Sequence, residues 1–212
     1  FTEESATRCR FMGFDLAGSE DGFPPEKFRA EFEQVSRLHI PITVHAGENA
    51  GSEYIANAVM DLRASRIGHG LALPEDNLLM ARIQEDGICV EICPVSNFQT
   101  SRFMCADCDG VQRQYPLRKF LRRGNYVCIN TDNPIISYTN IIKEYFQASY
   151  AYGGAGLSLW ELLRIIRMGF VHSFMSLPER RAILGLADQI LFDLFSRNDV
   201  VELLRVLSAT TP

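Results

Sequence analysis

Four side chains in the sequence have the chemistry needed for a metal-dependent hydrolysis. They are two histidines and two carboxylates, namely His45, Glu48, His69 and Asp132. Imidazole and carboxylate are the usual ligands of a catalytic zinc ion, which keeps one coordination position open for water. Zinc lowers the pKa of that water from about 15.7 to about 7, and a histidine or glutamate that is not a ligand can then move protons. These residue types therefore predict a hydrolytic site.

Glycines flank His69 on both sides, in the segment Arg-Ile-Gly-His-Gly of residues 66–70. We interpret these glycines as leaving room for a ligand. A single histidine at the end of a strand is more often a hydrogen-bonded structural residue. Three candidate residues at the ends of separate predicted strands favour a shared site instead.

The candidate residues follow short apolar runs that alternate with helical patterns. The expected strands are 11–16, 40–44, 65–67, 88–93 and 126–130. The expected helices between them are 25–38, 52–63, 74–86 and 116–123. This alternation with short connections predicts an α/β protein with a parallel sheet. In a parallel barrel the reactive side chains gather at the carboxyl ends of the strands, which is where these polar residues fall.

The pattern becomes entirely helical after residue 140. The expected helices are 141–151, 159–174, 178–195 and 200–207. We expect residues 1–151 to form a partial barrel and residues 152–212 to form a helical extension packed on it. The apolar cluster at 160–166 fits either that packing or pairing with another subunit, so a homo-oligomer or larger assembly stays open.

Five strand–helix units fall short of the eight that close a TIM-like (β/α)8 barrel. Either the sheet is open, or about three units precede the first residue. The chain starts with Phe1 and carries no targeting signal, so we favour the second interpretation and expect a piece of a longer protein or a processed product. The sequence then represents the C-terminal units of the barrel and a helical tail.

The composition limits the classes of function. The chain has 212 residues, 47% of them apolar, and a formal net charge of −5. This apolar content suffices for a folded core, and the acidic balance argues against a nucleic-acid or anionic-membrane surface. No apolar run approaches the roughly 20 residues that span a bilayer. The six cysteines lie mostly in apolar, strand-like runs, which favours a reducing cytoplasm.

Five segments of the chain, in order, resemble the successive signatures of the adenosine deaminase family. They are Asp15–Gly18, Thr43–Glu48, Arg66–Gly70, Glu91–Asn97 and Asn130–Pro134. The resemblance covers about residues 11–150 and is weaker through the helical tail. It implies a metal-dependent barrel that converts adenosine, or a related adenine compound, to the inosine form and ammonia.

The resemblance also implies roles for the four candidate residues. His45 and Asp132 would bind the zinc ion, and Asp132 would accept a hydrogen bond from the attacking water. Glu48 would donate a proton to purine N1. His69 would orient and electrostatically support the hydroxide as it adds to C6.

Two further residues would contact the purine. Gly18 would offer its backbone N–H to purine N3, where a residue without a side chain is needed. Asn133 stands where the family usually has a second Asp that meets purine N7. An asparagine amide carries N–H donors and can still serve N7.

The chain departs from the family pattern in its metal ligands. The family's His-x-His at the end of the first strand is absent, and neither His39 nor His172 lies at a strand end. The sequence therefore supplies two of the expected ligands, and residues upstream must supply the others if the protein is an enzyme.

A segment without a match in the family pattern contains Cys105 and Cys108. A single C-x-x-C fits two reduced thiols better than a structural zinc site. The basic helix that follows suits either a solvated surface or a phosphorylated ligand.

Three functions remain open at this point. The first is zinc-dependent deamination of an adenine nucleoside or nucleotide. The second is a related barrel hydrolase that acts on another amino-heterocycle. The third is an inactive, deaminase-like assembly module. Retention of Glu48, His69 and Asp132 favours an enzyme, because a scaffold has no chemical need of them.

Overall fold

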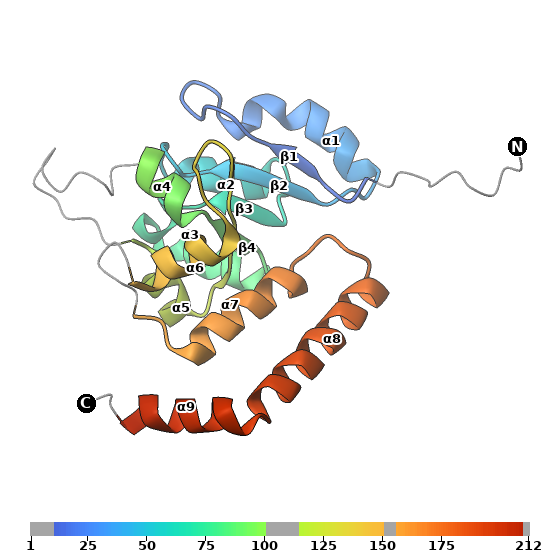
Figure 1. Cartoon of the computed structure of the whole chain (residues 1–212). Coiled ribbons are helices and arrows are strands. Elements are labelled where there is room, and N and C mark those ends of the chain that lie inside the picture. The colour runs from blue at the N-terminus through green and yellow to red at the C-terminus, as the bar shows by residue number, and fades with distance from the viewer. Residues whose placement is uncertain (1–10, 101–114, 151–155, 210–212) are drawn as a thin grey trace, which may run out of the picture. The chain divides into compact units, whose positions relative to one another are not determined.

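A parallel sheet of five strands organises the chain. The computed structural model describes residues 11–100, 115–150 and 156–209. The strands lie in chain order within the sheet, and each pairs in parallel with the next. They are β1 (Phe14–Leu16), β2 (Ile42–Ala46), β3 (Arg66–His69), β4 (Cys89–Ile92) and β5 (Tyr126–Ile129). The predicted α/β class and parallel sheet are confirmed (Figure 1).

Helices connect the strands, as the apolar spacing predicts. They are η2 (Pro25–Phe28), α1 (Arg29–Arg37), α2 (Ser52–Met60), η3 (Leu73–Glu75), α3 (Asn77–Glu85), α4 (Pro94–Thr100) and α5 (Leu117–Arg123). The Asp76 side chain caps α3 by accepting the backbone N–H groups of Leu78 and Leu79. Gly124 ends α5 with a φ of 80°, in the left-handed conformation that suits glycine at this position.

The core lies between the sheet and these helices. Because parallel strands are covered on both faces, their residues form near-continuous apolar runs. The fully buried side chains include Val44, Ile67 and Val90 of the strands and Ile55, Ile83 and Phe120 of α2, α3 and α5. This packing holds the carboxyl ends of the strands at one edge.

The register aligns the strand ends that carry the candidate residues. His45 of β2 lies beside Gly68 of β3, and Ala46 lies beside His69. Gly68 in turn pairs with Glu91 of β4. His69 therefore lies on the strand next to that of His45, one residue position nearer the carboxyl edge of the sheet.

Two further helices complete the unit that contains the sheet. They are α6 (Ile141–Tyr150) and α7 (Leu159–Val171). Helix α7 packs against β5 and buries Ile165. The structure therefore groups α7 with the sheet, in a compact unit that ends at Phe174, whereas the sequence boundary at 151/152 assigns it to the extension.

The described residues of the second compact unit, which starts at Met175, are mainly helical. It contains α8 (Leu177–Phe195) and α9 (Asn198–Ala209). A capping box starts α8, in which Ser176 and Glu179 satisfy each other's backbone N–H groups. Packing of this extension on the barrel stays a prediction.

The described part of the chain contains three of the six cysteines. Cys105 and Cys108 lie outside the described residues. Cys89, Cys93 and Cys128 are free thiols and are buried. No helix in the described part of the chain is both long and apolar enough to cross a membrane.

Candidate active site

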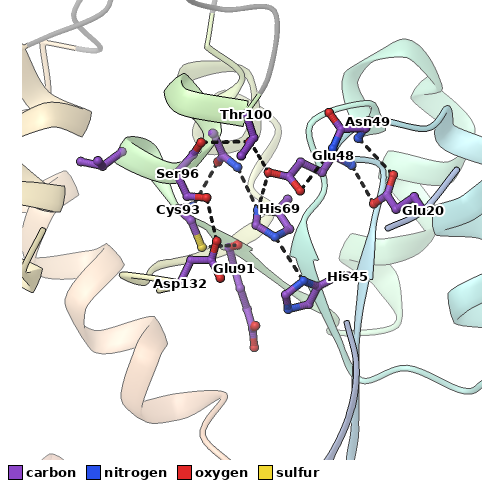
Figure 2. A network of polar contacts seen from close by, with 12 residues as sticks. Glu20, His45, Glu48, Asn49, His69, Glu91, Cys93, Ser96, Thr100 and Asp132 are labelled. Atoms are coloured by element: carbon purple, nitrogen blue, oxygen red, sulfur yellow. Dashed lines mark hydrogen bonds and ion pairs between the residues drawn. The ribbon is translucent and has the colours of Figure 1, made fainter. Parts of the chain in front are cut away.

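The predicted catalytic and metal-binding residues lie at the carboxyl ends of three strands. His45 belongs to β2 and His69 is the last residue of β3. Glu48 follows β2 by two residues, and Asp132 follows β5 by three. Figure 2 shows these side chains in one polar network.

The two imidazoles of this network face each other. His69 Nε2 lies 3.3 Å from His45 Nδ1, and the ring planes meet at 83°. The other nitrogen of His45, Nε2, lies 3.6 Å from Oδ2 of Asp15, the middle residue of β1. His45 thus contacts His69 of β3 (Figure 2) as well as Asp15 of β1.

The glycines beside His69 serve packing. A Cβ on Gly68 would stand 2.8 Å from His45 Cδ2, and a Cβ on Gly70 would stand 2.8 Å from Val90 Cγ1. Gly70 also has a φ of 60°, which a side chain would strain. The space that these glycines leave is filled by His45 and Val90, so our interpretation that they make room for a ligand was wrong.

Asn97 of α4 determines how the His69 ring is protonated. Its Oδ1 accepts the Cys93 backbone N–H at 3.2 Å and the Tyr115 hydroxyl at 3.0 Å. Because a backbone N–H can only donate, the Asn97 amide nitrogen must face His69 Nδ1, 2.8 Å away. Nδ1 then accepts, and the proton of the neutral ring resides on Nε2.

Burial also disfavours a positive charge on the His69 ring. The His69 side chain is 2% exposed, and its burial lowers the pKa of the imidazole below the ordinary 6.5. The nearby Glu48 carboxylate raises the same pKa, but burial is the larger effect. The neutral ring is therefore favoured. His69 also has a φ of 63°, an uncommon conformation outside glycine that is frequent at functional sites.

Glu48 is held at both its side chain and its backbone. Its Oε1 accepts the Thr100 hydroxyl at 2.5 Å and lies 3.7 Å from His69 Nδ1. The buried carboxylate of Glu20 accepts the backbone N–H groups of Glu48, Asn49 and Ala50 at 3.0, 3.0 and 2.7 Å. Glu20 therefore fixes the loop that carries Glu48 (Figure 2).

Asp132 lies on the turn after β5 and is oriented by α4. Its Oδ2 accepts the Ser96 hydroxyl at 2.7 Å (Figure 2). Asp132 adopts a φ of 54°, so it is, like His69, a non-glycine residue in the left-handed conformation. The neighbouring Asn133 is exposed. Its backbone oxygen accepts the N–H of Ser137, which closes the turn.

Gly18 lies in an open part of the site. It has a φ of 112°, and no atom stands within 4 Å of the place where a Cβ would be. Gly18 and His45 line the same cavity, whose volume is about 250 Å³. The left-handed backbone explains why glycine occupies this position.

Helix α4 connects most of the site and was not predicted from the sequence. Ser96, Asn97 and Thr100 of this helix contact Asp132, His69 and Glu48, respectively. No role was predicted for Glu20 from the sequence. Glu20 and Asn97 stand in polar segments at strand ends, which is the signal that could have indicated them.

The donor set has the right chemistry for zinc but too few members. His45 and Asp132 offer an imidazole and a carboxylate, the ligand types that zinc binds. In the described part of the chain, no three His, Cys, Asp or Glu side chains group closely enough to hold a metal ion. The described residues therefore fit part of a zinc site, and a complete one needs further ligands.

The fold and the site define an α/β protein with its polar residues at the carboxyl edge of a parallel sheet. Solved structures share this architecture. Adenine deaminase from Arthrobacter aurescens superposes with a TM-score of 0.72 at 24% identity, covering 85% of this chain and 52% of that one. An amidohydrolase from Burkholderia ambifaria with bound zinc gives a TM-score of 0.71 at 21% identity, covering 84% and 49%. The predicted fold, the C-terminal portion of such a barrel, is confirmed.

Sequence similarity then identifies the family. The adenosine deaminase family model matches residues 2–190, and this chain belongs to that family. Adenosine deaminase from Enterococcus faecalis is 36% identical over 178 residues, which cover 84% of this chain and 50% of the relative. The chain spans about half the length of the curated relatives it matches. The resemblance read from the five segments is confirmed.

Proposed function

We propose that this chain forms the C-terminal part of the active site of a zinc-dependent deaminase. The reaction is the hydrolysis of adenosine, or of an adenine nucleotide, to the inosine form and ammonia. The observation that carries this proposal is the gathering of Glu48, His69 and Asp132 around α4. Three strands and one helix are used to place these three groups, an arrangement that suits proton transfer.

Glu48 is the proposed proton donor to purine N1. The contacts of its side chain with Thr100 and of its loop with Glu20 restrict where its carboxyl group can point. A general acid must lie within hydrogen-bond reach of the atom that it protonates, so this restriction serves catalysis. Protonation of N1 withdraws electrons from the ring and makes C6 electrophilic.

His69 and Asp132 are proposed to orient the water that attacks C6. With Nδ1 of His69 occupied by Asn97, its Nε2 carries the proton. This N–H faces His45 Nδ1 in the structure and is proposed to donate to the attacking water in place of that contact. Asp132 retains one carboxylate oxygen besides the one that binds Ser96, and this oxygen can accept from the water. The two residues thereby fix the direction of attack.

His45 and Asp132 are the residues of this chain proposed to hold zinc. When bound, the metal supplies Lewis-acid activation of water at neutral pH. The missing ligands would come from residues outside the described part of the chain. The similar amidohydrolase has bound zinc, which supports a metal-dependent function for this fold.

Gly18 and Asn133 are proposed to bind the purine. The open backbone of Gly18 leaves its N–H accessible for purine N3, and the exposed amide of Asn133 can donate to N7. The cavity that Gly18 shares with His45 has a volume suited to part of a small ligand.

The buried free thiols support a reducing compartment, and we propose the cytoplasm. Cys89, Cys93 and Cys128 form no disulfide in the structure. Disulfides are rare in the cytosol, where thiols are kept reduced.

The test uses the natural protein that contains this chain. Purified protein is analysed for zinc and is incubated with adenosine, AMP and ATP, and conversion to the inosine forms is followed by ultraviolet absorbance. We expect bound zinc and conversion of at least one of the three. Zinc-free protein without any conversion would contradict the proposal and favour the assembly module. Turnover of another amino-heterocycle alone would favour the related hydrolase.

A further inference from the structure

One buried carboxylate lies outside the set of proposed catalytic residues. Glu144 is on the first turn of α6, and its side chain is fully buried. Its Oε1 accepts the hydroxyl of Thr139 at 2.6 Å, and its Oε2 accepts the backbone N–H of Val95 at 2.9 Å. A buried carboxylate is costly to desolvate, so these contacts call for an explanation.

The contact with Val95 reaches the beginning of α4. The first N–H groups of a helix have no partner within the helix, and a buried one that stays unpaired destabilises the fold. Glu144 satisfies one of them from 49 residues away. Helices α4 and α6 also pack against each other (Figure 1). Glu144 therefore fixes the start of α4 to α6.

Helix α4 is the element on which the proposed active site depends. Within six residues of Val95, three of its side chains contact three different candidate residues, and Asn97 also sets the tautomer of His69. Of the other residues of this short helix, Pro94, Val95 and Phe98 are buried. A shift or rotation of α4 would therefore displace the groups around Glu48, His69 and Asp132 together.

We propose that Glu144 is a positioning residue, which sets the placement of α4 and through it the geometry of the active site. This inference rests on the proposed deaminase function. Glu144 contacts none of the reacting groups in the structure and acts through Val95 and Thr139. Its role requires an acceptor atom at a fixed reach from α6, and it does not require a negative charge.

Two conservative variants separate reach from charge. Glu144→Gln keeps the length of the side chain: its amide oxygen can accept from Val95, and its nitrogen can donate to Thr139. Glu144→Asp keeps the charge but is shorter by one methylene, so it withdraws from Val95. We expect Gln to retain kcat within about threefold, because both contacts survive. We expect Asp to lower kcat by about tenfold to a hundredfold, with a smaller change in KM, because catalysis is sensitive to misplacement of about 1 Å.

A core variant controls for loss of stability alone. Ile83→Val removes one methyl group from α3, whose residue 83 is fully buried, and should lower the free energy of unfolding by about 0.5–1.5 kcal/mol. We expect it to leave kcat unchanged. Activity that follows stability across all three variants would overturn the proposal. So would a Gln variant as impaired as Asp, because the charge would then matter more than the reach.

Amide hydrogen exchange tests the anchoring of α4 without relying on activity. In Glu144→Asp, residues 95–100 of α4 should exchange faster, whereas residues 77–85 of α3 should not change. Glu144→Gln should match the wild type in both segments. Unchanged exchange of α4 in the Asp variant would overturn the proposal even if the protein is a deaminase.

If the wild type lacks deaminase activity, the proposed function fails and the exchange data still decide the role of Glu144. If Glu144→Asp does not fold, Glu144→Gln alone decides. Wild-type exchange and kcat in Glu144→Gln would support a requirement for side-chain length rather than charge, and altered values would refute it.

Discussion

The side-chain amide of Asn97 donates to Nδ1 of His69 across 2.8 Å and so determines which nitrogen of the imidazole carries its proton. The amide cannot turn over, because its oxygen already accepts from the Cys93 backbone and the Tyr115 hydroxyl. The orientation of His69 thus depends on a peptide N–H that belongs to the strand end before α4. The backbone N–H of Cys93 therefore determines, through Asn97, which nitrogen of His69 carries the proton.

Replacing Asn97 by Asp tests this relationship. The carboxylate would present an acceptor to Nδ1 and favour the tautomer with its proton there, which removes the proton from Nε2. We expect kcat for deamination to fall by about a hundredfold, the scale of loss from a misoriented catalytic group. Asn198→Asp, on the exposed first turn of α9, is the matched control and should keep wild-type kcat. Equal kcat values for the two variants would contradict the role of Asn97.

Replacing Asp132 by Ala tests the proposed metal ligand. The variant loses a carboxylate and leaves the Ser96 hydroxyl without this partner. We expect zinc content to fall well below one ion per protein and turnover to fall to background. Metal analysis and the absorbance assay measure the two effects. A variant that binds zinc like the wild type would remove Asp132 from the ligand set.

Replacing Glu20 by Gln tests the anchor of the Glu48 loop. Glutamine has one oxygen, so it cannot accept all three backbone N–H groups that Glu20 accepts. We expect the free energy of unfolding to fall by about 1 kcal/mol, because one of these part-buried backbone donors loses its partner. Denaturant titration measures it. Glu33→Gln removes an exposed ion pair with Arg37 and should change stability by less than about 1 kcal/mol. Equal losses in both variants would argue against the anchor.

The stability contributed by Glu144 should depend on pH. Burial raises the pKa of Glu144 above the ordinary 4.5, with a smaller contribution in the same direction from Asp132, while the contacts of Thr139 and Val95 and the charge of Lys143 lower it. Between 4.5 and the raised value, the folded state holds a proton that the unfolded state releases. Stability from this group is therefore fully present below pH 4.5 and is lost as pH rises through the folded pKa.

Thermal unfolding of the wild type and Glu144→Gln across pH 4 to 8 measures this effect. Because glutamine does not titrate, the wild type should lose stability relative to the variant as the pH rises. A difference that stays constant with pH, or that changes in the opposite sense, would contradict the raised pKa.

The sheet was predictable from the sequence because its signals are local. Runs such as Ile88–Cys93 are apolar and bounded by Gly87 and Pro94, and β4 (Cys89–Ile92) lies within this run. The order of the polar strand ends also followed from the chain, since parallel strands share a carboxyl edge.

Helix α4 and the two anchoring carboxylates were not predictable in the same way. The seven residues of α4 are too few for a clear period, and Ser96, Asn97 and Thr100 have low helix propensity. Contacts of α4 with distant residues stabilise it instead. Glu20 and Glu144 accept backbone N–H groups 28 or more residues away, and no local pattern indicates such partners. The glycines beside His69 were misread because their packing partners, His45 and Val90, lie on other strands.

Turnover by Glu48→Gln at matched zinc content decides whether Glu48 is the general acid of a deaminase. Glutamine keeps the size of the side chain and an acceptor for Thr100 but has no acidic proton for the purine. We expect wild-type zinc content with kcat reduced by about a hundredfold to ten-thousandfold, the range for a lost general acid. Glu85→Gln, on the exposed end of α3, should match the wild type in both measurements. Full activity in Glu48→Gln would contradict the proposed mechanism.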